Sequence, residues 1–134
     1  MVYNHENQGR VLLLEDEPII CRAASRTLIN QGFDVDIASN GLIAKDKVDM
    51  HTPYEFFIFD IKTPIMNGIQ VYEYLEQAYP DLTNRVIFTT GDSLGLGTKV
   101  FLERVNKPFL SKPYTPSQLL AIIRQVNSIS LPHA

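Results

Sequence analysis

Short, mostly apolar runs recur along this chain, and each one ends directly at a polar residue. The clearest runs cover residues 11–14, 56–59, 86–89 and 109–111, and stretches with the roughly 3.6-residue period of amphipathic helices separate them. Alternation of this kind is typical of repeated strand–helix units, which form one parallel sheet with helices on both faces. The sequence therefore predicts an α/β fold: a three-layer sandwich around a five-stranded parallel sheet.

The bounds of the predicted elements follow from these runs and from proline and glycine. The predicted strands cover residues 10–14, 34–38, 54–59, 84–89 and 108–111. The predicted helices cover residues 18–30, 41–50, 68–78, 98–105 and 116–128. Pro18 and Pro116 suit the first position of a helix, where proline loses no hydrogen bond, and Gly32 suits a left-handed helix cap. On the first helix, the residues expected on the buried side are Ile19, Cys21, Ala23 and Leu28.

The length and charge of the chain exclude several classes of protein. Its 134 residues suit one domain, which we place at residues 10–129 between tails at 1–9 and 130–134. The net charge of −3 does not favour direct contact with nucleic acid, and no apolar run approaches the roughly 18 residues of a membrane span. The chain starts without a signal-peptide core, and its single cysteine, Cys21, suits a reducing compartment, so we expect a cytoplasmic protein.

Chemically functional residues stand where the predicted strands end, and parallel strands would bring them to one edge of the sheet. These residues are Glu15, Asp16, Asp60, Thr90 and Lys112. Open α/β sheets bind ligands at this edge. Hard divalent cations such as Mg²⁺ prefer oxygen ligands and use one or two carboxylates together with a phosphate oxygen. We expect direct ligands from Asp16 and Asp60, a water-mediated contact from Glu15, and a further ligand from the backbone carbonyl of Lys62.

The same residues suit the transfer of a phosphoryl group. A carboxylate such as that of Asp60 can attack phosphorus and hold the group as an acyl phosphate. The Lys112 ammonium would neutralise one phosphoryl oxygen, and the Thr90 hydroxyl would donate a hydrogen bond to another. An aspartate at a strand end is often only a turn former or a helix cap, so no single residue is decisive. Crowded carboxylates, however, repel one another without a cation, which favours a functional site.

Four stretches of the chain resemble the motifs of one family, the response-regulator receiver domain of two-component signalling. They are Leu-Glu-Asp-Glu-Pro at residues 14–18, Asp-Ile-Lys-Thr-Pro-Ile-Met-Asn-Gly at 60–68, Thr-Thr-Gly-Asp at 89–92 and Ser-Lys-Pro-Tyr at 111–114. The intervals between these motifs also resemble those of the family. The resemblance extends over about residues 10–129 and implies a flavodoxin-like fold.

The resemblance implies that Asp60 is a phosphoacceptor in a phosphorelay, charged by a partner histidine kinase or histidine phosphotransfer domain. Such a receiver domain is a signalling module rather than an enzyme, because it catalyses only its own phosphorylation and dephosphorylation. Its oligomeric state is left open. The resemblance also implies a bound Mg²⁺, and the ligands would be Glu15, Asp16, Asp60 and the backbone carbonyl of Lys62.

The resemblance further implies a switch through Thr90 and Phe109, with Lys112 contacting the phosphoryl group. The peptide bond between Lys112 and Pro113 is often cis in such domains. Two departures from the family stand out in this chain. Phe109 has no hydroxyl, so the switch is restricted to the rotamer and packing of its ring, and Thr63 stands where the family commonly has an apolar residue.

Two residues are expected to set the lifetime of the phosphoryl group. Lys62 lies two residues after Asp60, and Asp92 lies two residues after Thr90, so both side chains would flank the mouth of the site and pair across it. We expect Lys62 to shield the phosphoryl group from the in-line water that hydrolyses it. The alternative is that Lys62 extends freely into solvent.

Two other functions fit parts of the sequence. A phosphatase of the haloacid-dehalogenase type also uses an aspartate nucleophile after a strand, but it needs a second acid where this chain has Lys62. A receiver-like interaction module that no longer accepts phosphate is the other alternative, although all the key residues are present. Residues 91–110 are also similar to the C-terminal receivers of hybrid histidine kinases, so the domain fits either a stand-alone receiver or part of a larger protein.

Overall fold

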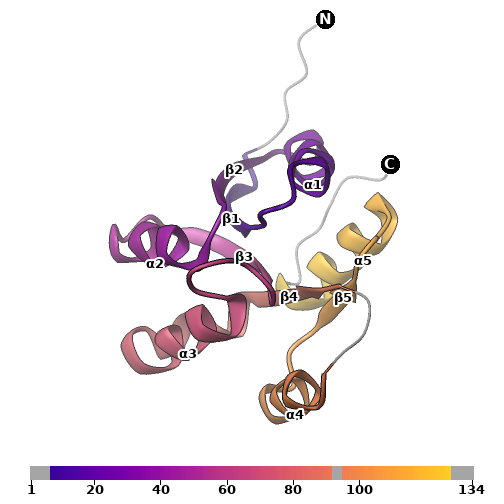
Figure 1. Ribbon diagram of the computed structural model, residues 1–134. Coiled ribbons are helices and arrows are strands. Elements are labelled where there is room, and N and C mark those ends of the chain that lie inside the picture. The colour runs from indigo at the N-terminus through magenta and orange to yellow at the C-terminus, as the bar shows by residue number, and fades with distance from the viewer. Residues whose placement is uncertain (1–6, 92–94, 128–134) are drawn as a thin grey trace, which may run out of the picture.

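A five-stranded parallel sheet forms the centre of the computed structural model, which describes residues 7–91 and 95–127 (Figure 1). The strands are β1 (Gly9–Leu14), β2 (Phe33–Ala38), β3 (Tyr54–Asp60), β4 (Val86–Thr90) and β5 (Phe109–Ser111). Their order across the sheet is β2-β1-β3-β4-β5, and every neighbouring pair is parallel. This is the doubly wound, flavodoxin-like order, so the predicted fold class is confirmed.

Helices cover both faces of this sheet (Figure 1). They are α1 (Pro18–Asn30), α2 (Gly41–Asp49), α3 (Gly68–Ala78), α4 (Leu96–Val105) and α5 (Pro116–Asn127), and a 3₁₀ helix, η1 (Pro80–Arg85), precedes β4. On β1, Val11 and Leu13 pack with α1 and α5, whereas Leu12 and Leu14 pack with α2, α3 and α4. Alternate side chains of a strand point to opposite faces, so β1 anchors both layers of helices.

The position of each strand in the sheet agrees with its composition. β3 lies between β1 and β4, and its consecutive apolar residues are buried on both faces: Phe56, Phe57, Ile58 and Phe59. A continuous apolar run is typical of such an interior strand. β5 lies at an edge of the sheet and begins at Phe109, directly after Pro108, whose carbonyl accepts the Phe88 N–H at 3.1 Å. A proline at the start of a strand is tolerated because the regular ladder begins after it.

The predicted buried side of α1 was wrong at two positions. Cys21, Ala24 and Leu28 are the buried residues of this helix, whereas Ala23 is exposed and Ile19 is 75% exposed. Each residue advances the helix by about 100°, so positions two residues before or after Cys21 lie about 200° around it and face solvent. The predicted bounds of α1 and the left-handed conformation of Gly32, with a φ of 95°, are confirmed.

Several bounds from β3 onward differ from the prediction. β4 begins at Val86 instead of residue 84, because Pro80 starts η1 and the 3₁₀ turn continues to Arg85. α4 begins at Leu96 and includes Gly97, whose position in the helix is exposed. β3 and β4 each extend one residue further than predicted, to Asp60 and Thr90. These two polar residues therefore belong to the strands, which fix their positions.

Two glycines allow the loop after β3 to pack closely against its neighbours. A Cβ atom on Gly68 would lie 2.3 Å from the carbonyl oxygen of Asp60, and one on Gly41 would lie 2.0 Å from the carbonyl oxygen of Met66. The Gly41 N–H donates to that Met66 oxygen at 2.7 Å. Asn67 then caps α3, with its side chain accepting the Gln70 N–H at 2.9 Å. The backbone around Asp60 is thus held by contacts that exclude any larger side chain.

We expect Gly68→Ala to destabilise the domain by about 1–3 kcal/mol, because the added methyl would collide with the Asp60 carbonyl. Gly97→Ala is the matched control. An added Cβ there meets nothing within 4 Å, so the change should stabilise α4 by roughly 0.5–1 kcal/mol. Urea unfolding followed by circular dichroism measures both effects. If Gly68→Ala were as stable as the wild type, the close approach would be refuted.

Candidate functional site

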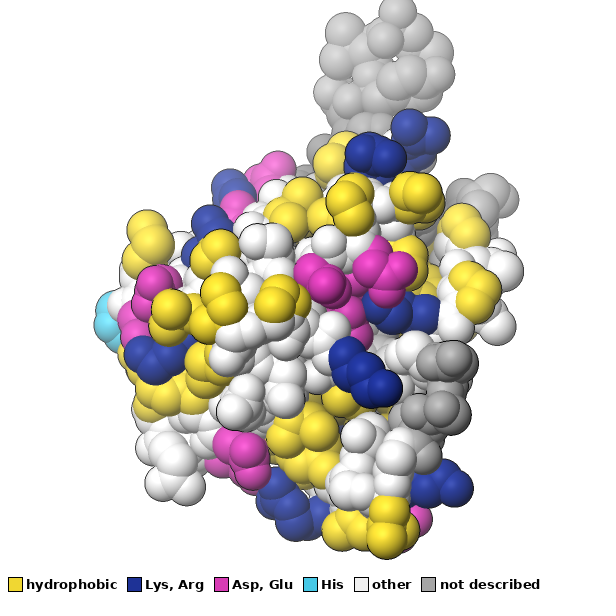
Figure 2. All heavy atoms as spheres, in the orientation of Figure 1, with side chains coloured by type: hydrophobic (Ala, Val, Ile, Leu, Met, Phe, Trp, Pro, Cys, Tyr) yellow, Lys and Arg dark blue, Asp and Glu magenta, His cyan; other side chains and the backbone are white. Residues whose placement is uncertain are grey.

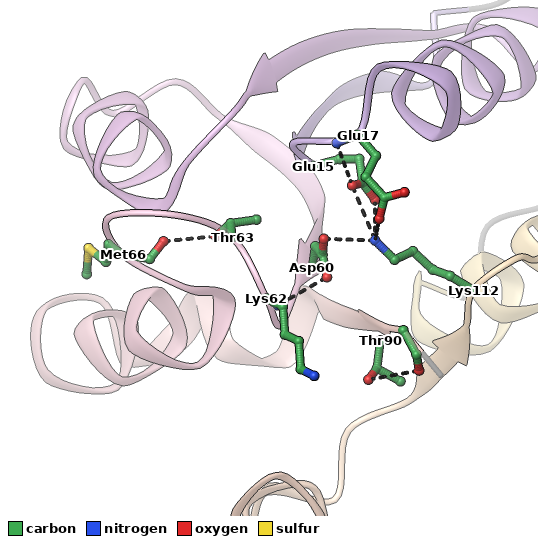
Figure 3. Close-up of polar contacts among 9 residues, drawn as sticks. Glu15, Glu17, Asp60, Lys62, Thr63, Met66, Thr90 and Lys112 are labelled. Atoms are coloured by element: carbon green, nitrogen blue, oxygen red, sulfur yellow. Dashed lines mark hydrogen bonds and ion pairs between the residues drawn. The ribbon is translucent and has the colours of Figure 1, made fainter. Parts of the chain in front are cut away.

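The carboxyl ends of three strands bring one lysine and three acidic residues into contact (Figure 3). Glu15 follows β1, Glu17 directly precedes α1, Asp60 ends β3, and Lys112 follows β5. Thr90 ends β4, the strand between β3 and β5. Because the strands are parallel, these residues share one edge of the sheet, which is the arrangement that the sequence predicted.

The ammonium of Lys112 is the centre of this cluster within the part of the chain that the structure describes. Its Nζ atom lies 2.9 Å from Asp60 Oδ2, 3.0 Å from Glu17 Oε1, and 3.2 and 3.3 Å from the two carboxylate oxygens of Glu15. The side chains of Glu15 and Asp60 are each 1% exposed, and that of Lys112 is 7% exposed. Lys112 therefore compensates the negative charge of two deeply buried carboxylates.

Carboxylate oxygens converge on a second point of the same site. Glu15, Asp16 and Asp60 each offer an oxygen, and these oxygens lie within 4.8 Å of one another. Asp16 is exposed whereas the other two residues are buried, so the group opens to solvent on one side. Hard divalent cations such as Mg²⁺ prefer oxygen donors and keep several waters. The donor set and its open side therefore fit a magnesium ion.

Glu17 is a part of the site that the sequence analysis missed. Its carboxylate contacts Lys112 although its side chain is 58% exposed. Its backbone N–H also donates to Glu15 Oε2 at 3.0 Å, which orients that buried carboxylate. The signal was present in the sequence, because Glu17 is the last of three consecutive acidic residues and stands directly before Pro18, where α1 begins.

The buried charges shift the pKa values of the site. Burial raises the pKa of Glu15 to about 7; the Glu17 N–H and the Lys112 ammonium oppose this shift, and the negative charge of Asp60 adds to it. Burial acts to lower the pKa of Lys112. Its carboxylate partners, Asp60 first among them, outweigh burial, so the pKa of Lys112 is raised above its ordinary value and the ammonium stays protonated.

Thr90 and Lys62 lie beside the cluster. Thr90 is buried, and its hydroxyl donates to the Gly91 carbonyl at 3.5 Å, a long and weak bond that leaves the hydroxyl free to turn. The Lys62 N–H donates to Asp60 Oδ1 at 3.2 Å. The Lys62 side chain is exposed and extends away from the Asp60 carboxylate (Figure 3). Asp92, its predicted pairing partner, lies outside the described residues.

Backbone hydrogen bonds fix the site residues to the end of β4. The N–H of Lys112 donates to the Thr90 carbonyl at 2.7 Å, and the N–H of Ile61 donates to the Thr89 carbonyl at 2.9 Å. The loops that follow β3 and β5 are therefore both attached to β4. The peptide bond between Lys112 and Pro113 is cis, as the family resemblance implied.

Both departures from the family pattern have defined positions in the structure. The Thr63 hydroxyl donates at 2.9 Å to the Met66 carbonyl, the same oxygen that accepts the Gly41 N–H. A polar residue at this position therefore holds the loop after Asp60 in place. Phe109 lies on the edge strand β5 and is 43% exposed, so its ring is outside the hydrophobic core.

A doubly wound five-stranded sheet with clustered carboxylates and a lysine at its carboxyl edge is the arrangement of a receiver-type signalling domain. The comparison with protein families agrees, because residues 11–124 match the model of the response regulator receiver domain. The chain therefore belongs to the response regulator receiver domain family, whose members act in two-component systems. No helix that the structure describes has the length and apolar character needed to cross a membrane.

Individual relatives and solved structures agree with this assignment. The chain is 32% identical over 119 residues to the probable transcriptional regulator ycf29 of Porphyra purpurea, covering 87% of this chain and 55% of the relative. It is 28% identical over 116 residues to the response regulator ArlR of Staphylococcus epidermidis, covering 87% and 51%. This chain thus spans about half the length of these curated relatives. A CheY-like receiver domain protein from Methanospirillum hungatei superposes with a TM-score of 0.77 at 26% identity, covering 87% of this chain and 91% of that one.

We expect Glu15 to make the metal-free domain less stable as the pH rises from about 4.5 to about 7. In this window the unfolded chain has released the Glu15 proton, whereas the folded chain still holds it, so raising the pH favours unfolding. The check is the melting temperature of the wild type and of Glu15→Gln in EDTA, between about pH 5 and about pH 8. The wild type should lose stability relative to the variant, and parallel curves would contradict the raised pKa.

Proposed function

We propose that this receiver domain is a phosphoacceptor of a two-component phosphorelay. Asp60 takes a phosphoryl group from the phosphohistidine of a histidine kinase or histidine phosphotransfer domain, in a Mg²⁺-dependent reaction that switches an interaction surface. The observation that carries the proposal is the position of Asp60, a buried carboxylate that belongs to the converging acidic group and also contacts the Lys112 ammonium. Such a residue has a site for a divalent cation on one side and a fixed positive charge on the other.

The contacts of Asp60 suit a positioned nucleophile. Its Oδ1 atom accepts the Lys62 N–H, and its Oδ2 atom accepts from Lys112. In the proposed step, an Asp60 oxygen forms a bond to phosphorus while the bond between phosphorus and the donor histidine nitrogen breaks, and that electron pair stays on the imidazole. A carboxylate nucleophile needs no general base, so positioning and charge neutralisation are the main tasks of the site.

Two positive charges would neutralise the phosphoryl oxygens. The proposed Mg²⁺ ligands are Glu15, Asp16, Asp60 and the backbone carbonyl of Lys62. The bound ion would withdraw negative charge from one phosphoryl oxygen. The Lys112 ammonium lies beside Asp60 Oδ2 and would contact another oxygen as a point charge.

The proposed switch runs through Thr90 and Phe109. The Thr90 hydroxyl, which has only a long bond to Gly91, turns toward a phosphoryl oxygen and leaves space behind it. Phe109 is partly exposed on the neighbouring strand β5 and turns inward to fill this space. Because Phe109 carries no hydroxyl, the change in its rotamer and packing alone alters the surface around β5.

The proposed role is signalling rather than turnover of a substrate. The domain, placed at residues 10–129, catalyses only its own phosphorylation and dephosphorylation in the cytoplasm. Its relatives ycf29 and ArlR are named as regulators, which supports an output through contacts with other proteins or domains. We propose that the domain is the C-terminal receiver of a hybrid histidine kinase. The sequence of the full-length gene product tests this proposal, because such a protein has a kinase core before the receiver.

Incubation with Mg²⁺ and acetyl phosphate should add one phosphoryl group to the domain, as measured by intact mass. Asp60→Asn should abolish the addition, because an amide is a poor nucleophile, and Asp16→Asn should reduce it strongly by removing a metal ligand. Asp46→Asn removes an exposed aspartate of α2 and is the matched control, with labelling like the wild type. Undiminished labelling of Asp60→Asn would sink the proposal.

Lys62→Ala should shorten the life of the phosphorylated state, by about two- to tenfold, because the long side chain, which extends away from the Asp60 carboxylate in Figure 3, would turn toward the phosphoryl group and hinder the in-line approach of water. Asp92→Ala should change the rate in the same direction if it frees Lys62. The measurement is the exponential loss of phosphorylated protein in excess Mg²⁺. Lys47→Ala on α2 is the matched control and should decay like the wild type. Equal or slower decay of Lys62→Ala would show that its side chain shields nothing.

A further inference from the structure

Lys112 occupies the carboxylate oxygens that the proposed cation would need. Glu15 and Asp60 belong to the converging acidic group, and both also contact the Lys112 ammonium at 2.9 to 3.3 Å. The Lys112 ammonium and a divalent cation would repel each other at such short range, so the two cannot both bind these oxygens as strongly as either would alone. Binding of a divalent cation therefore requires Lys112 to give up part of its contact with Glu15 and Asp60.

Glu17 differs from the other two partners of Lys112. Its carboxylate is not among the three whose oxygens converge, and its side chain is largely exposed. Figure 3 shows that Glu17 reaches Lys112 from the start of α1, whereas Asp60 approaches from the end of β3. The contact between Glu17 and Lys112, at 3.0 Å, can therefore persist when the oxygens of the acidic group are engaged elsewhere.

We infer that Glu17 is a positioning residue, which keeps Lys112 paired while the acidic group binds a divalent cation. The inference rests on the proposed magnesium function and names a residue that assists it without being a ligand. When the cation binds, Lys112 gives up part of its contact with Glu15 and Asp60 and keeps its contact with Glu17. The ammonium thereby remains close enough to Asp60 to contact a phosphoryl group bound there.

The energetic reason is the burial of Lys112. An ammonium that is almost wholly buried is costly when it loses its carboxylate partners, because little water replaces them. Glu17 removes this cost and loses little hydration itself, since it is exposed. Without Glu17, Lys112 would stay on Glu15 and Asp60 and compete with the cation. Glu17 therefore strengthens cation binding through Lys112.

The negative charge of Glu17 could also strengthen cation binding by direct electrostatic attraction, a mechanism that does not involve Lys112. Two variants separate the two mechanisms. Glu17→Asp keeps the charge and withdraws the carboxylate from Lys112 by one methylene group. Lys112→Met removes the competing ammonium and retains much of the apolar stem.

The experiment is a Mg²⁺ titration followed by backbone amide NMR shifts, which gives a dissociation constant independently of phosphorylation. Glu17→Asp and Glu17→Gln should each weaken Mg²⁺ binding by roughly three- to tenfold. Lys112→Met should bind Mg²⁺ more tightly than the wild type. In the Lys112→Met background, Glu17→Gln should change the constant by less than about twofold. Glu103→Gln removes an exposed acid of α4 and is the matched control, without effect.

Wild-type affinity in Glu17→Asp would overturn the positioning role, and so would an equal loss from Glu17→Gln in both backgrounds, which would indicate direct electrostatic attraction. Melting curves in EDTA identify any variant that fails to fold. If the folded wild type bound no Mg²⁺, the proposed metal function itself would fail, and the inference with it. A failure confined to Glu17 leaves the proposed function intact.

Discussion

Two carboxylates, those of Glu15 and Asp60, are buried at the edge of an apolar sheet, and the Lys112 ammonium is what compensates them. A buried carboxylate without such a partner would destabilise the fold by several kcal/mol, roughly the cost of breaking a buried ion pair. The three residues follow or end three different strands, and β4 lies between β3 and β5. The three charged groups meet only if these strands lie in this order and end at the same edge of the sheet, so the stability of the cluster depends on the order and lengths of the strands.

Burial explains why much of the fold could be predicted from the sequence. An interior parallel strand needs apolar side chains on both faces, so a continuous run such as that of β3 marks its own position in the sheet. The bounds of α1 and α3 followed from Pro18, Pro80 and glycine. The buried face of α1 did not follow, because apolar residues occur on both sides of this helix, and the contacts with β1 and α5, not its composition, select Cys21, Ala24 and Leu28.

The candidate site could be predicted only where it depends on the ends of strands. Parallel strands bring their carboxyl ends together, so the meeting of Glu15, Asp60 and Lys112 required no knowledge of side-chain geometry. The run of three acids marked Glu17 as a candidate, but its contact with Lys112 depends on the direction in which α1 leaves the sheet and on the reach of a lysine side chain, and spacing along the chain encodes neither. The hydrogen bond from Thr63 to Met66 is likewise a property of the folded loop.

The two backbone hydrogen bonds at the end of β4 have a mechanical consequence. Thr89 and Thr90 are consecutive residues, and their carbonyls hold the loops that carry Asp60 and Lys112. Asp60, the proposed nucleophile, and Lys112 are thus held in place by the end of the same strand, to which Thr90 also belongs. A displacement of the end of β4 would therefore move Asp60 and Lys112 together, so the distance between these two residues would be preserved while their position relative to the helices changed.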